Sequence, residues 1–464
     1  MKTDSVTLAA VTGGTVQGPV SFFSGLSIDS RAVRAGDLFV AIPGPNHDGH
    51  DFLAQALAVA NGALVSRAVP GGAIPEGKCV VRVADTLAAL RVWARYVLDC
   101  VRPKVVAITG SVGKTTTKEL AAGILARRFS VARTTGNRNN GIGLPLEVAR
   151  IGEGTEIAVL ELGMSTPGEI RLLSDLVRPA VGVVTAVTAA HFGSFHSMDG
   201  IEHAKGEILS GMSAESVFVA NADDPRSLAI GRRHRGPVLR YGLTGEPGLD
   251  ASARNLAEEP GGTRFLLELR GRSADVSLPL PGRHNVSNFL AAAAAASALS
   301  VTAEEAAAAA PALRAARHRG EVRRLDGDLL LYDDSYNSSP AALRAAWSAF
   351  LGTAGSRRKV AVIGEMLELG RKSRDFHFEA GRDLGGRFDV LVAVRGDAAA
   401  LADGALTGSA GAGTVVFAVD AAEAEAVVAG LLAPGDALFV KGSRGVGLDR
   451  LVEAIAARGQ GGRR

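Results

Sequence analysis

The chain of 464 residues has little cysteine, little excess charge and no long hydrophobic run. Its two cysteines, Cys79 and Cys100, are too few for a disulfide framework and lack the spacing of metal ligands. The net charge is only +3, and no Lys/Arg block is interleaved with aromatic residues, which argues against a nucleic-acid partner. No run of about 18 apolar residues could span a membrane, and residues 1–14 lack a signal-peptide pattern. We therefore expect a soluble protein of the reducing cytoplasm, without a nucleic-acid or membrane partner.

What the chain does have is enough apolar sequence for several cores, with 47% hydrophobic and 21% charged residues. Its length predicts about three domains. Strand-like and helix-like stretches alternate along most of the chain, which predicts an α/β fold with mostly parallel sheets. The predicted strands are 38–42, 80–83, 157–162, 181–187, 217–220, 321–325, 329–332, 359–363, 390–394 and 437–441, and the predicted helices include 52–61, 86–99, 115–128, 285–299 and 303–313.

Two composition breaks divide this pattern into three segments. Pro103 precedes a new strand, and two Ala-rich helices end near residue 316. We expect an N-terminal α/β domain at 1–102, a central P-loop domain with a parallel sheet at 103–316, and a C-terminal Rossmann-like domain at 317–464.

The most informative stretch is 105–119, where an apolar, β-branched run leads into a glycine loop and a helix. Gly110 and Gly113 let the backbone turn tightly, so that its N–H groups can point at phosphate oxygens. In a loop of this kind Lys114 reaches the β- and γ-phosphates of ATP, and the Thr115 hydroxyl binds Mg²⁺. The stretch therefore predicts an ATP site, whereas an ordinary Gly-rich turn is the less favoured alternative.

The loop is shorter than a strict Walker A motif, which has four residues between its first glycine and the Gly-Lys pair. Only two residues separate the two glycines here. The following helix directs its positive N-terminal end at the anion. The predicted nucleotide-binding residues of the loop are Gly110, Ser111, Val112, Gly113, Lys114, Thr115 and Thr116.

Glu161 ends the strand predicted at 157–162. Ligands of open α/β sheets bind in the crevice at the carboxyl ends of the strands, where this carboxylate would lie. Mg²⁺ takes carboxylate, hydroxyl and phosphate oxygens, so Glu161 and Thr115 are a candidate pair of metal ligands. The alternative is a glutamate in a surface loop.

Further polar residues follow other strands and loops of the same segment. His191 comes after the strand at 181–187, and Lys205 lies fourteen residues further on a helix that begins near Met198. By residue type alone, each is more often a structural or solvated group than a ligand. The loop between Thr135 and Leu146 is rich in asparagine, whose side chains suit a phosphate or sugar, although an ordinary Asn/Gly turn is equally possible. The candidates from this loop and from the start of the Ala-rich helix, where asparagine also often serves as a cap, are Asn137, Asn139, Asn140, His284, Asn285 and Asn288.

The third segment has three polar stretches, each directly after a predicted strand, at 333–340, 364–370 and 441–444. Because the strands are expected to be parallel, these stretches would line one edge of one sheet. Asp334, Tyr336 and Asn337 in the first stretch are candidate ligand contacts. The alternative for that stretch is helix capping by one of its serines, with Pro340 at the first helical position.

Taken in order along the chain, these motifs resemble those of the Mur ligases, the ATP-dependent amide-forming enzymes of peptidoglycan synthesis. The short phosphate loop, the Asn-rich loop, Glu161, His191 and Lys205 fit that family in order and spacing. The resemblance extends over nearly the whole chain, and the stretches at 334–340, 364–370 and 441–444 are typical of the branch that adds D-alanyl-D-alanine. It implies ATP and Mg²⁺ as cofactors, UDP-N-acetylmuramoyl-tripeptide and D-alanyl-D-alanine as small-molecule substrates, and a monomer.

The resemblance also implies roles for particular residues. Lys114 would hold the γ-phosphate, and Thr115 and Glu161 would bind one Mg²⁺. The second Mg²⁺ would be held by Glu161, His191 and a carbamylated Lys205. Nucleotide contacts are expected from His284, Asn285, Asn288, Arg319, Asp334, Tyr336 and Asn337, and substrate contacts from Ser30, Arg31, Asp48, His50, Asn137, Asn139, Asn140 and Lys441.

The predicted reaction joins a carboxylate to an amine through an acyl phosphate made from ATP. Two enzyme alternatives are a sister Mur ligase that adds one amino acid and a folylpolyglutamate-type ligase. A third alternative is a P-loop nucleotide-binding module without ligase chemistry. The stretch at 364–370 argues against the two other ligases, and His191 and Lys205 argue against a simple nucleotide switch.

Overall fold

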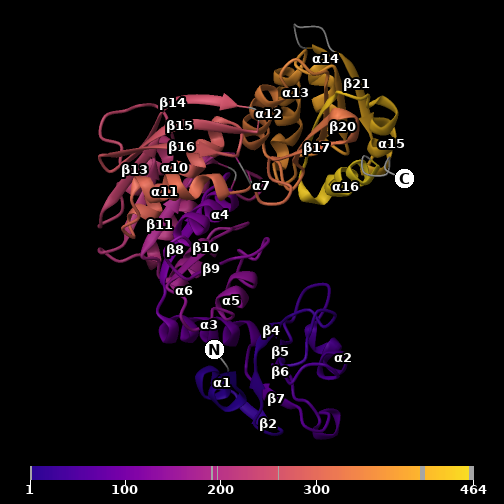
Figure 1. The fold of residues 1–464 in the computed structure, drawn as a ribbon. Helices are drawn as coiled ribbons and strands as arrows, with labels where there is room; N and C mark the ends of the chain where they lie inside the picture. The colour runs from indigo at the N-terminus through magenta and orange to yellow at the C-terminus, as the bar shows by residue number, and fades with distance from the viewer. Residues whose placement is uncertain (1–2, 190–191, 196, 260, 408–412, 459–464) are drawn as a thin grey trace.

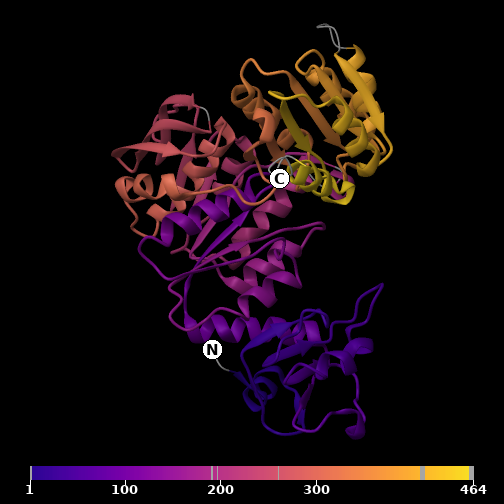
Figure 2. The same ribbon diagram turned by 45° about the vertical axis from the view of Figure 1, so that its right-hand side comes forward.

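The computed structural model of the chain describes residues 3–189, 192–195, 197–259, 261–407 and 413–458. Three α/β units follow one another along the chain, each with its own main sheet. The nine-stranded sheet of the middle unit lies between the sheets of the N-terminal and C-terminal units (Figure 1 and Figure 2). The predicted three-part α/β fold is therefore confirmed. Within the described residues, no helix is long and apolar enough to cross a membrane.

The N-terminal unit has a five-stranded sheet in the order β2-β7-β6-β5-β4. All its pairs are parallel except β2 with β7. A separate antiparallel pair joins β1 and β3. The elements are β1 (Thr3–Asp4), α1 (Ser5–Thr12), β2 (Thr15–Gln17), β3 (Phe22–Phe23), β4 (Gly25–Ser27), β5 (Asp37–Val40), α2 (Leu53–Leu57), β6 (Gly62–Val65), β7 (Cys79–Arg82) and α3 (Thr86–Val101).

Helix α3 connects the N-terminal unit to the middle unit. It begins after Asp85, whose carboxylate caps the first turn by accepting from the backbone of Leu87 and Ala88. Trp93 and Val97 are buried, and the helix packs against α1 on one side and against α5 and α6 of the middle unit on the other. The two units therefore share one hydrophobic core through α3.

The middle unit has a nine-stranded sheet in the order β16-β15-β14-β13-β12-β11-β8-β10-β9. Residues of β8 alternate between two cores: Val105 and Ala107 belong to one, Val106 and Ile108 to the other. Helices α6, α8 and α9 cover the first face, whereas α4, α10 and α11 cover the second. The elements are β8 (Lys104–Thr109), α4 (Lys114–Leu125), β9 (Val131–Arg133), α5 (Gly143–Val148), β10 (Ile157–Glu161), α6 (Glu169–Val177), β11 (Val181–Val184), α7 (Phe192–Phe195), α8 (Met198–Gly206), β12 (Val217–Asn221), α9 (Pro225–Gly231), β13 (Val238–Gly242), β14 (Ala251–Glu259), β15 (Gly262–Leu269), β16 (Arg272–Leu278), α10 (Arg283–Ser297) and α11 (Ala303–Ala309).

Two features of the middle unit differ from the sequence predictions. Strands β14, β15 and β16 form an antiparallel extension of the sheet, and the predicted strands do not include them. The Asn-rich loop also ends earlier than residue 146, because α5 begins at Gly143. Pro145 is compatible with that helix because it lies in the first turn, where no intrahelical N–H bond is lost. Asn140 accepts from the backbone N–H groups of Ile142 and Gly143 and so supports the helix start.

The C-terminal unit is a doubly wound sheet in the order β17-β18-β22-β19-β20-β21, parallel except for β17 with β18. Helices α12, α13 and α14 bury one face, and α15 and α16 bury the other. Ser339 caps α12 with Pro340 at its first position, so the alternative of helix capping by a serine of this stretch is correct for Ser339. The elements are β17 (Glu321–Leu325), β18 (Leu329–Asp334), α12 (Pro340–Ala354), β19 (Lys359–Gly364), α13 (Ser373–Leu384), β20 (Val390–Val394), α14 (Ala398–Thr407), β21 (Thr414–Ala418), α15 (Ala421–Leu431), β22 (Ala437–Lys441) and α16 (Leu448–Arg458).

Candidate active site

The glycine loop joins β8 to α4, as predicted, and both of its glycines are required there. Gly110 has φ 145° and Gly113 has φ 82°, backbone conformations that residues with a side chain rarely adopt. A Cβ atom at Gly110 would collide with the hydroxyl of Thr185, and one at Gly113 would collide with the side chain of Asn288. The loop therefore packs directly against β11 and the start of α10.

Lys114, the first residue of α4, turns its side chain back over the loop. Its Nζ donates to the carbonyl oxygens of Gly110 at 2.8 Å and Ser111 at 3.2 Å. Burial lowers the pKa of Lys114, and the nearby Arg319 guanidinium lowers it further, whereas Glu161 opposes the shift. No carboxylate pairs with this ammonium among the ion pairs of the described residues. It has only carbonyl partners, which are weaker than the oxygens of a phosphate group.

Glu161 ends β10 at the edge of the sheet where the glycine loop lies. The side chain is buried, so the alternative of a surface-loop glutamate is wrong. Thr115 Oγ1 donates to Glu161 Oε2 at 2.8 Å, and Asn139 Nδ2 donates to Glu161 Oε1 at 2.8 Å. The structure thus brings together the hydroxyl and the carboxylate that the sequence predicts as a pair, and adds the Asn-rich loop to them.

Lys205 lies on α8, as predicted, and is 1% exposed. Its Nζ is buried and has no hydrogen-bond partner within the part of the chain that the structure describes. Burial lowers the pKa of Lys205 well below its usual value, and Lys114 lowers it further, while Glu161, Glu169 and Glu207 oppose the shift. Burial therefore disfavours the charged form of this amine. His191, the other predicted metal ligand of this group, lies outside the described residues.

The start of α10 lies against the glycine loop. Asn285 is not a helix cap, because Gly282 occupies that position and the Asn285 amide instead donates to the Pro281 carbonyl at 2.8 Å. Asn288 accepts from Thr117 of α4 at 3.3 Å. Burial, with a smaller effect of Lys441, lowers the pKa of His284 to about 4, so that its imidazole is neutral at pH 7.

The polar stretches of the C-terminal unit meet at one edge of its sheet, as predicted, because β18, β22 and β19 are adjacent. Lys441 is buried at the end of β22. Its Nζ donates to the carboxylate of Asp334 and to the carbonyl oxygen of Asn337, the latter at 2.8 Å. Burial raises the pKa of Asp334, and the Lys441 ammonium opposes that rise. This contact holds the first polar stretch against the third.

Tyr336 lies between two arginines. The guanidinium carbon of Arg319 is 4.1 Å from the centre of the Tyr336 ring, and that of Arg444 is 5.4 Å away. Arg444 also donates to the tyrosine hydroxyl at 3.2 Å. These contacts gather two positive charges at the edge of the C-terminal sheet, on a flat aromatic surface.

One cavity of about 490 Å³ lies between the middle and C-terminal units, and most of the groups described above line it. Its lining includes predicted site residues from both units, although Gly110 and Lys205 do not line it. They are Ser111, Val112, Gly113, Lys114, Thr115, Thr116, Asn137, Asn139, Asn140, Glu161, His284, Asn285, Asn288, Arg319, Asp334, Tyr336, Asn337 and Lys441.

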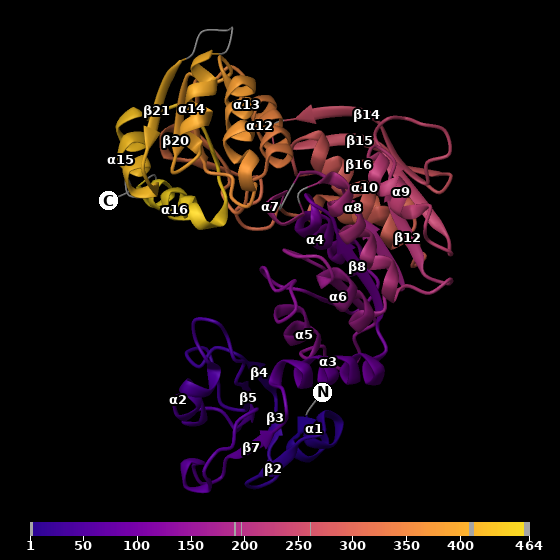
Figure 3. The ribbon, with the colours of Figure 1, turned by 180° about the vertical axis from the view of Figure 1, so that it is seen from behind.

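A direct contact between the two units closes one side of this region. The backbone N–H of Gly193 in α7 donates to the carbonyl oxygen of Glu368 at 3.0 Å. Phe192 and Phe376 make an edge-to-face contact with ring centres 6.1 Å apart, and Lys372 lies over the Phe192 ring at 5.7 Å. Figure 3 shows α7 beside the C-terminal unit, so the middle unit reaches across to it at this point.

The predicted substrate residues of the N-terminal unit form a separate polar group, and none of them lines the cavity. Ser30 donates to Gln55 at 3.2 Å, and Arg31 pairs with Asp29 while 82% of its side chain stays exposed. Asp48 accepts from the His50 backbone N–H at 2.9 Å and contacts His50 Nδ1 at 2.6 Å, and these two contacts, the backbone one foremost, lower the pKa of Asp48. Their sheet lies at the end of the molecule away from the C-terminal unit (Figure 1).

Several lining residues were not among the predicted site residues. Glu169 begins α6, and its sequence signal is the acidic first turn after a glycine. A stripe of alanines on α12 faces the cavity, at a spacing that sequence alone assigns to an ordinary helix core. Glu368 and Arg444 lie in two of the polar stretches that the sequence predicts after strands, but their residue types alone give them no particular role. The unpredicted lining residues include Glu169, Ser338, Ser339, Ala341, Ala342, Ala345, Ala346, Glu368, Ser443 and Arg444.

Comparison with known proteins identifies the family of this chain. Residues 23–84 match the Mur ligase family catalytic domain, 108–296 the Mur ligase middle domain, and 318–444 the Mur ligase glutamate ligase domain. A UDP-N-acetylmuramoyl-tripeptide–D-alanyl-D-alanine ligase of Bacillus subtilis is 34% identical over 378 residues, which are 81% of this chain and 81% of that protein. The chain belongs to the Mur ligase family.

Solved structures of Mur ligases share the whole architecture of this Mur ligase. A crystal structure of MurF from Acinetobacter baumannii is 30% identical and covers 98% of this chain and 99% of its own, with a TM-score of 0.87. The MurF ligase of Thermotoga maritima, solved in complex with ADP, is 29% identical and covers 93% of this chain and 97% of its own, with a TM-score of 0.80. The three units of this chain are thus the three-domain Mur ligase fold.

Proposed function

We propose that this Mur ligase joins D-alanyl-D-alanine to UDP-N-acetylmuramoyl-tripeptide, with ATP converted to ADP and phosphate. The observation that carries the proposal is the cavity, in which the glycine loop of one unit faces the polar strand-end loops of another. A nucleotide-binding module needs only the glycine loop. A ligase needs the loops of both units, because it must hold ATP beside two further reactants. The name of the similar Bacillus subtilis ligase supplies the two substrates, and the similar Thermotoga maritima ligase was solved in complex with ADP.

ATP is proposed to bind with its phosphates on the loop from Gly110 to Thr116 and with its base near the start of α10. The backbone N–H groups of the loop and the N-terminus of α4 favour anionic oxygens. The neutral imidazole of His284 and the amides of Asn285 and Asn288 suit an uncharged base. Arg319, Asp334, Tyr336 and Asn337 would complete the nucleotide site from the C-terminal unit.

The residues beside the loop also fit Mg²⁺, which takes hydroxyl and carboxylate oxygens. Thr115 and Glu161 would hold one ion, and Glu161, His191 and a carbamylated Lys205 would hold a second. The fit of Lys205 rests on its buried Nζ, which has no hydrogen-bond partner among the described residues and whose charged form burial disfavours. When bound, Mg²⁺ supplies charge stabilisation to the transferring phosphoryl group.

The proposed reaction has two steps. A carboxylate oxygen of the tripeptide attacks the γ-phosphorus of ATP, the bond from phosphorus to the β-bridging oxygen breaks, and ADP leaves. The free amine of D-alanyl-D-alanine then attacks the carbonyl carbon of the acyl phosphate, and phosphate leaves as the amine nitrogen loses its proton. Lys114 would stabilise the negative charge on the γ-phosphoryl oxygens, and the two units that face each other across the cavity would shield the acyl phosphate from water.

The remaining predicted residues are proposed to hold the tripeptide substrate along its length. Asn137, Asn139, Asn140 and Lys441 lie near the reacting end, since all four line the cavity. Ser30, Arg31, Asp48 and His50 would hold the uridine diphosphate part at the N-terminal unit. The exposed guanidinium of Arg31 is the natural partner of a diphosphate there.

The substrate requirement gives the direct test of this function. With the purified chain, Mg²⁺ and ATP, sustained ADP release is expected only when UDP-N-acetylmuramoyl-tripeptide and D-alanyl-D-alanine are both present. The reason is that the acyl phosphate forms on one substrate and is consumed by the other. A coupled ADP assay measures the rate, and mass spectrometry of the pentapeptide product confirms the amide bond.

The same assay separates the alternatives. D-Glutamate or L-lysine in place of D-alanyl-D-alanine is the control amine, and ADP release with either of them would assign a sister ligase instead. ATP-dependent addition of glutamate to a folate would favour a folylpolyglutamate-type ligase. A chain that binds ATP and forms no product with any of these amines would support the binding module.

The contact between α7 and the C-terminal unit gives a prediction about ATP binding. A Cβ atom at Gly370, which has φ 62°, would lie 2.7 Å from the Cα of Gly193 across that contact. Gly370→Ala is expected to push the two units apart and to weaken binding of a non-hydrolysable ATP analogue about ten-fold, since overpacking costs about 1–3 kcal/mol. Isothermal titration calorimetry measures the affinity, and small-angle scattering measures the separation.

Gly435→Ala is the matched control for that variant. Gly435 also has a positive φ, 85°, and belongs to the same unit, but a Cβ atom there meets nothing within 4 Å. Both variants therefore carry the backbone strain, whereas only Gly370→Ala adds the collision. Equal analogue affinity in the two variants would contradict the dependence of ATP binding on the contact between α7 and the C-terminal unit.

We also propose that the protein acts in the cytoplasm, where ATP is supplied, and as a monomer. The support for the monomer is that two units of one chain build the whole cavity. Analytical ultracentrifugation tests whether the protein is a monomer.

A further inference from the structure

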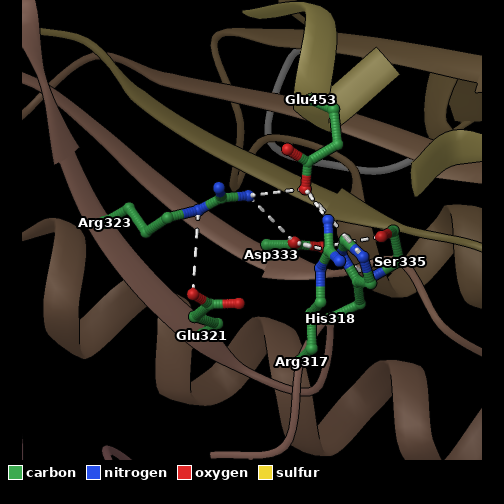
Figure 4. Close-up of polar contacts among 7 residues, drawn as sticks. All are labelled: Arg317, His318, Glu321, Arg323, Asp333, Ser335 and Glu453. Carbon is green, nitrogen blue, oxygen red and sulfur yellow. Dashed lines mark hydrogen bonds and ion pairs between the residues drawn. The ribbon is translucent and has the colours of Figure 1, made fainter. Parts of the chain in front are cut away.

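A carboxylate is fully buried beneath the C-terminal wall of the cavity, at Asp333 in β18. Its side chain is 0% exposed. Asp333 Oδ2 lies 2.7 Å from His318 Nδ1 and accepts from Arg323 at 3.2 Å. Asp333 Oδ1 accepts from the backbone N–H and the hydroxyl of Ser335, at 3.1 Å and 2.6 Å. Both oxygens are therefore fully used, as a buried carboxylate requires. Figure 4 shows these side chains gathered around Asp333.

This carboxylate joins two segments that are distant along the chain. His318 belongs to the stretch that leads from the middle unit into β17, and Ser335 belongs to the polar stretch after β18. The backbone joins them as well, because the N–H of Tyr336 donates to the carbonyl oxygen of His318 at 3.1 Å. His318 has φ 62°, a conformation that is uncommon for residues other than glycine and that needs support from its surroundings.

The residues next to these contacts are cavity residues. Arg319 follows His318 and Tyr336 follows Ser335, and the Arg319 guanidinium stacks on the Tyr336 ring at 4.1 Å. Both line the cavity, whereas His318 and Asp333 do not. Arg319 also acts on the glycine loop across the cavity, because its charge lowers the pKa of Lys114.

We propose that His318 and Asp333 are positioning residues that hold Arg319 and Tyr336 in the geometry needed to bind ATP. The inference rests on the proposed function, in which Arg319 and Tyr336 contact the nucleotide. His318 holds the backbone just before Arg319, and Asp333 holds both His318 and the turn that carries Tyr336. Loss of the pair frees the stacked arginine and tyrosine to move, so ATP must order them on binding.

The same cluster contains a more exposed ion pair, between Arg317 and Glu453. Arg317 contacts Glu453 of α16 at 2.9 Å, and the two side chains are 72% and 45% exposed (Figure 4). Exposed pairs contribute little because water and salt screen them. Arg317 is next to His318 in the sequence but has no contact with Asp333 among the ion pairs of the described residues. It therefore offers a matched control on the same stretch of chain.

The test compares three variants of the full chain by equilibrium binding of a non-hydrolysable ATP analogue with Mg²⁺. His318→Gly removes the imidazole and tolerates the positive φ, and we expect it to weaken analogue binding about ten-fold or more. His318→Asn also tolerates that φ and keeps a donor near the position of Nδ1, so it should bind within about three-fold of the unchanged chain. Arg317→Ala should bind like the unchanged chain, because its pair is exposed.

Steady-state kinetics adds a readout that a general loss of stability would not give. In His318→Gly the KM for ATP should rise about ten-fold, while the KM for D-alanyl-D-alanine stays within about two-fold. Thermal melting checks that each variant is folded. If His318→Gly does not fold, Ser335→Ala removes one donor from the same carboxylate and should weaken analogue binding about three-fold.

The outcomes distinguish this inference from the proposed function. Unchanged analogue affinity in folded His318→Gly, or in Ser335→Ala where it is needed, overturns the positioning role. A loss in His318→Asn as large as in His318→Gly, or an equal loss in Arg317→Ala, also overturns it. Absence of ligation by the unchanged chain overturns the proposed function instead, since analogue binding is measured without turnover.

Discussion

Lys114→Ala is expected to abolish ATP-dependent ligation, with turnover reduced on the order of a thousand-fold, while the chain stays folded. The side chain lies over the glycine loop, and among the described residues only carbonyl oxygens accept from its ammonium. Negative charge builds up on the transferring phosphoryl group, and a preorganised cation beside it stabilises that charge far more than water does. Alanine cannot replace this charge. The coupled ADP assay measures the loss.

The variant should fold because Lys114 contributes little to the stability of the protein. Burial lowers the pKa of this lysine, which means that the folded chain disfavours its charged form. Removing the ammonium therefore removes an unfavourable contribution together with two hydrogen bonds. Lys104→Ala is the control, since Lys104 is an exposed lysine at the opposite end of β8. Retained turnover in a folded Lys114→Ala variant would contradict the assignment of the phosphate loop.

The part of the site that could be predicted from the sequence depends on parallel strands. Strands β8 and β10 are neighbours, so the residues that follow or end them must meet at one edge. The contact of Thr115 with Glu161 follows from that rule. The same rule brought together the polar stretches after β18, β22 and β19. Apolar, β-branched runs made those strands visible in the sequence.

Other parts of the fold had no comparable signal. Strands β14 and β16 contain alanine, serine and charged residues, and most residues of each strand are exposed or only half-buried. Helix α5 contains Gly143 and Pro145, which are typical of loops, and forms because Asn140 supports its start. The turn from Asp333 to Tyr336 looks like a row of ligands, yet Asp333 is wholly internal. Residue type alone does not separate a buried positioning group from a residue that lines the cavity.

Local sequence patterns also could not predict that the middle and C-terminal units face each other across one cavity. Arg319 and Lys114 belong to different units, and the sequence does not give the angle between those units. The small residues Gly193 and Gly370 allow the backbones to approach, but isolated glycines occur throughout the chain. The resemblance to a family supplied these pairings, whereas the physics of strands and helices supplied the elements that carry them.

Lys205→Ala is expected to reduce turnover on the order of a thousand-fold. The reason is that a carbamate formed on the Lys205 side chain, rather than its amine, would bind Mg²⁺. A buried Nζ without a hydrogen-bond partner is unfavourable, and burial favours its neutral form. A neutral amine nitrogen can attack the carbon of CO₂, forming a C–N bond and releasing one proton. The resulting carbamate carries a negative charge on two oxygens, which are suitable ligands for Mg²⁺.

Two measurements separate a carbamate from a plain lysine at position 205. Labelling with ¹³CO₂ should give a protein-bound carbamate signal by ¹³C NMR in the unchanged chain and none in Lys205→Ala. Formate or acetate should partly restore turnover in Lys205→Ala, because a short carboxylate can occupy the space of the deleted side chain and supply the missing oxygens. The same additives should not restore Lys114→Ala, which lacks a cation rather than an anion. Full turnover in an unchanged chain that takes up no ¹³CO₂ would contradict the modification, because the oxygens that bind Mg²⁺ would then have to come from another group.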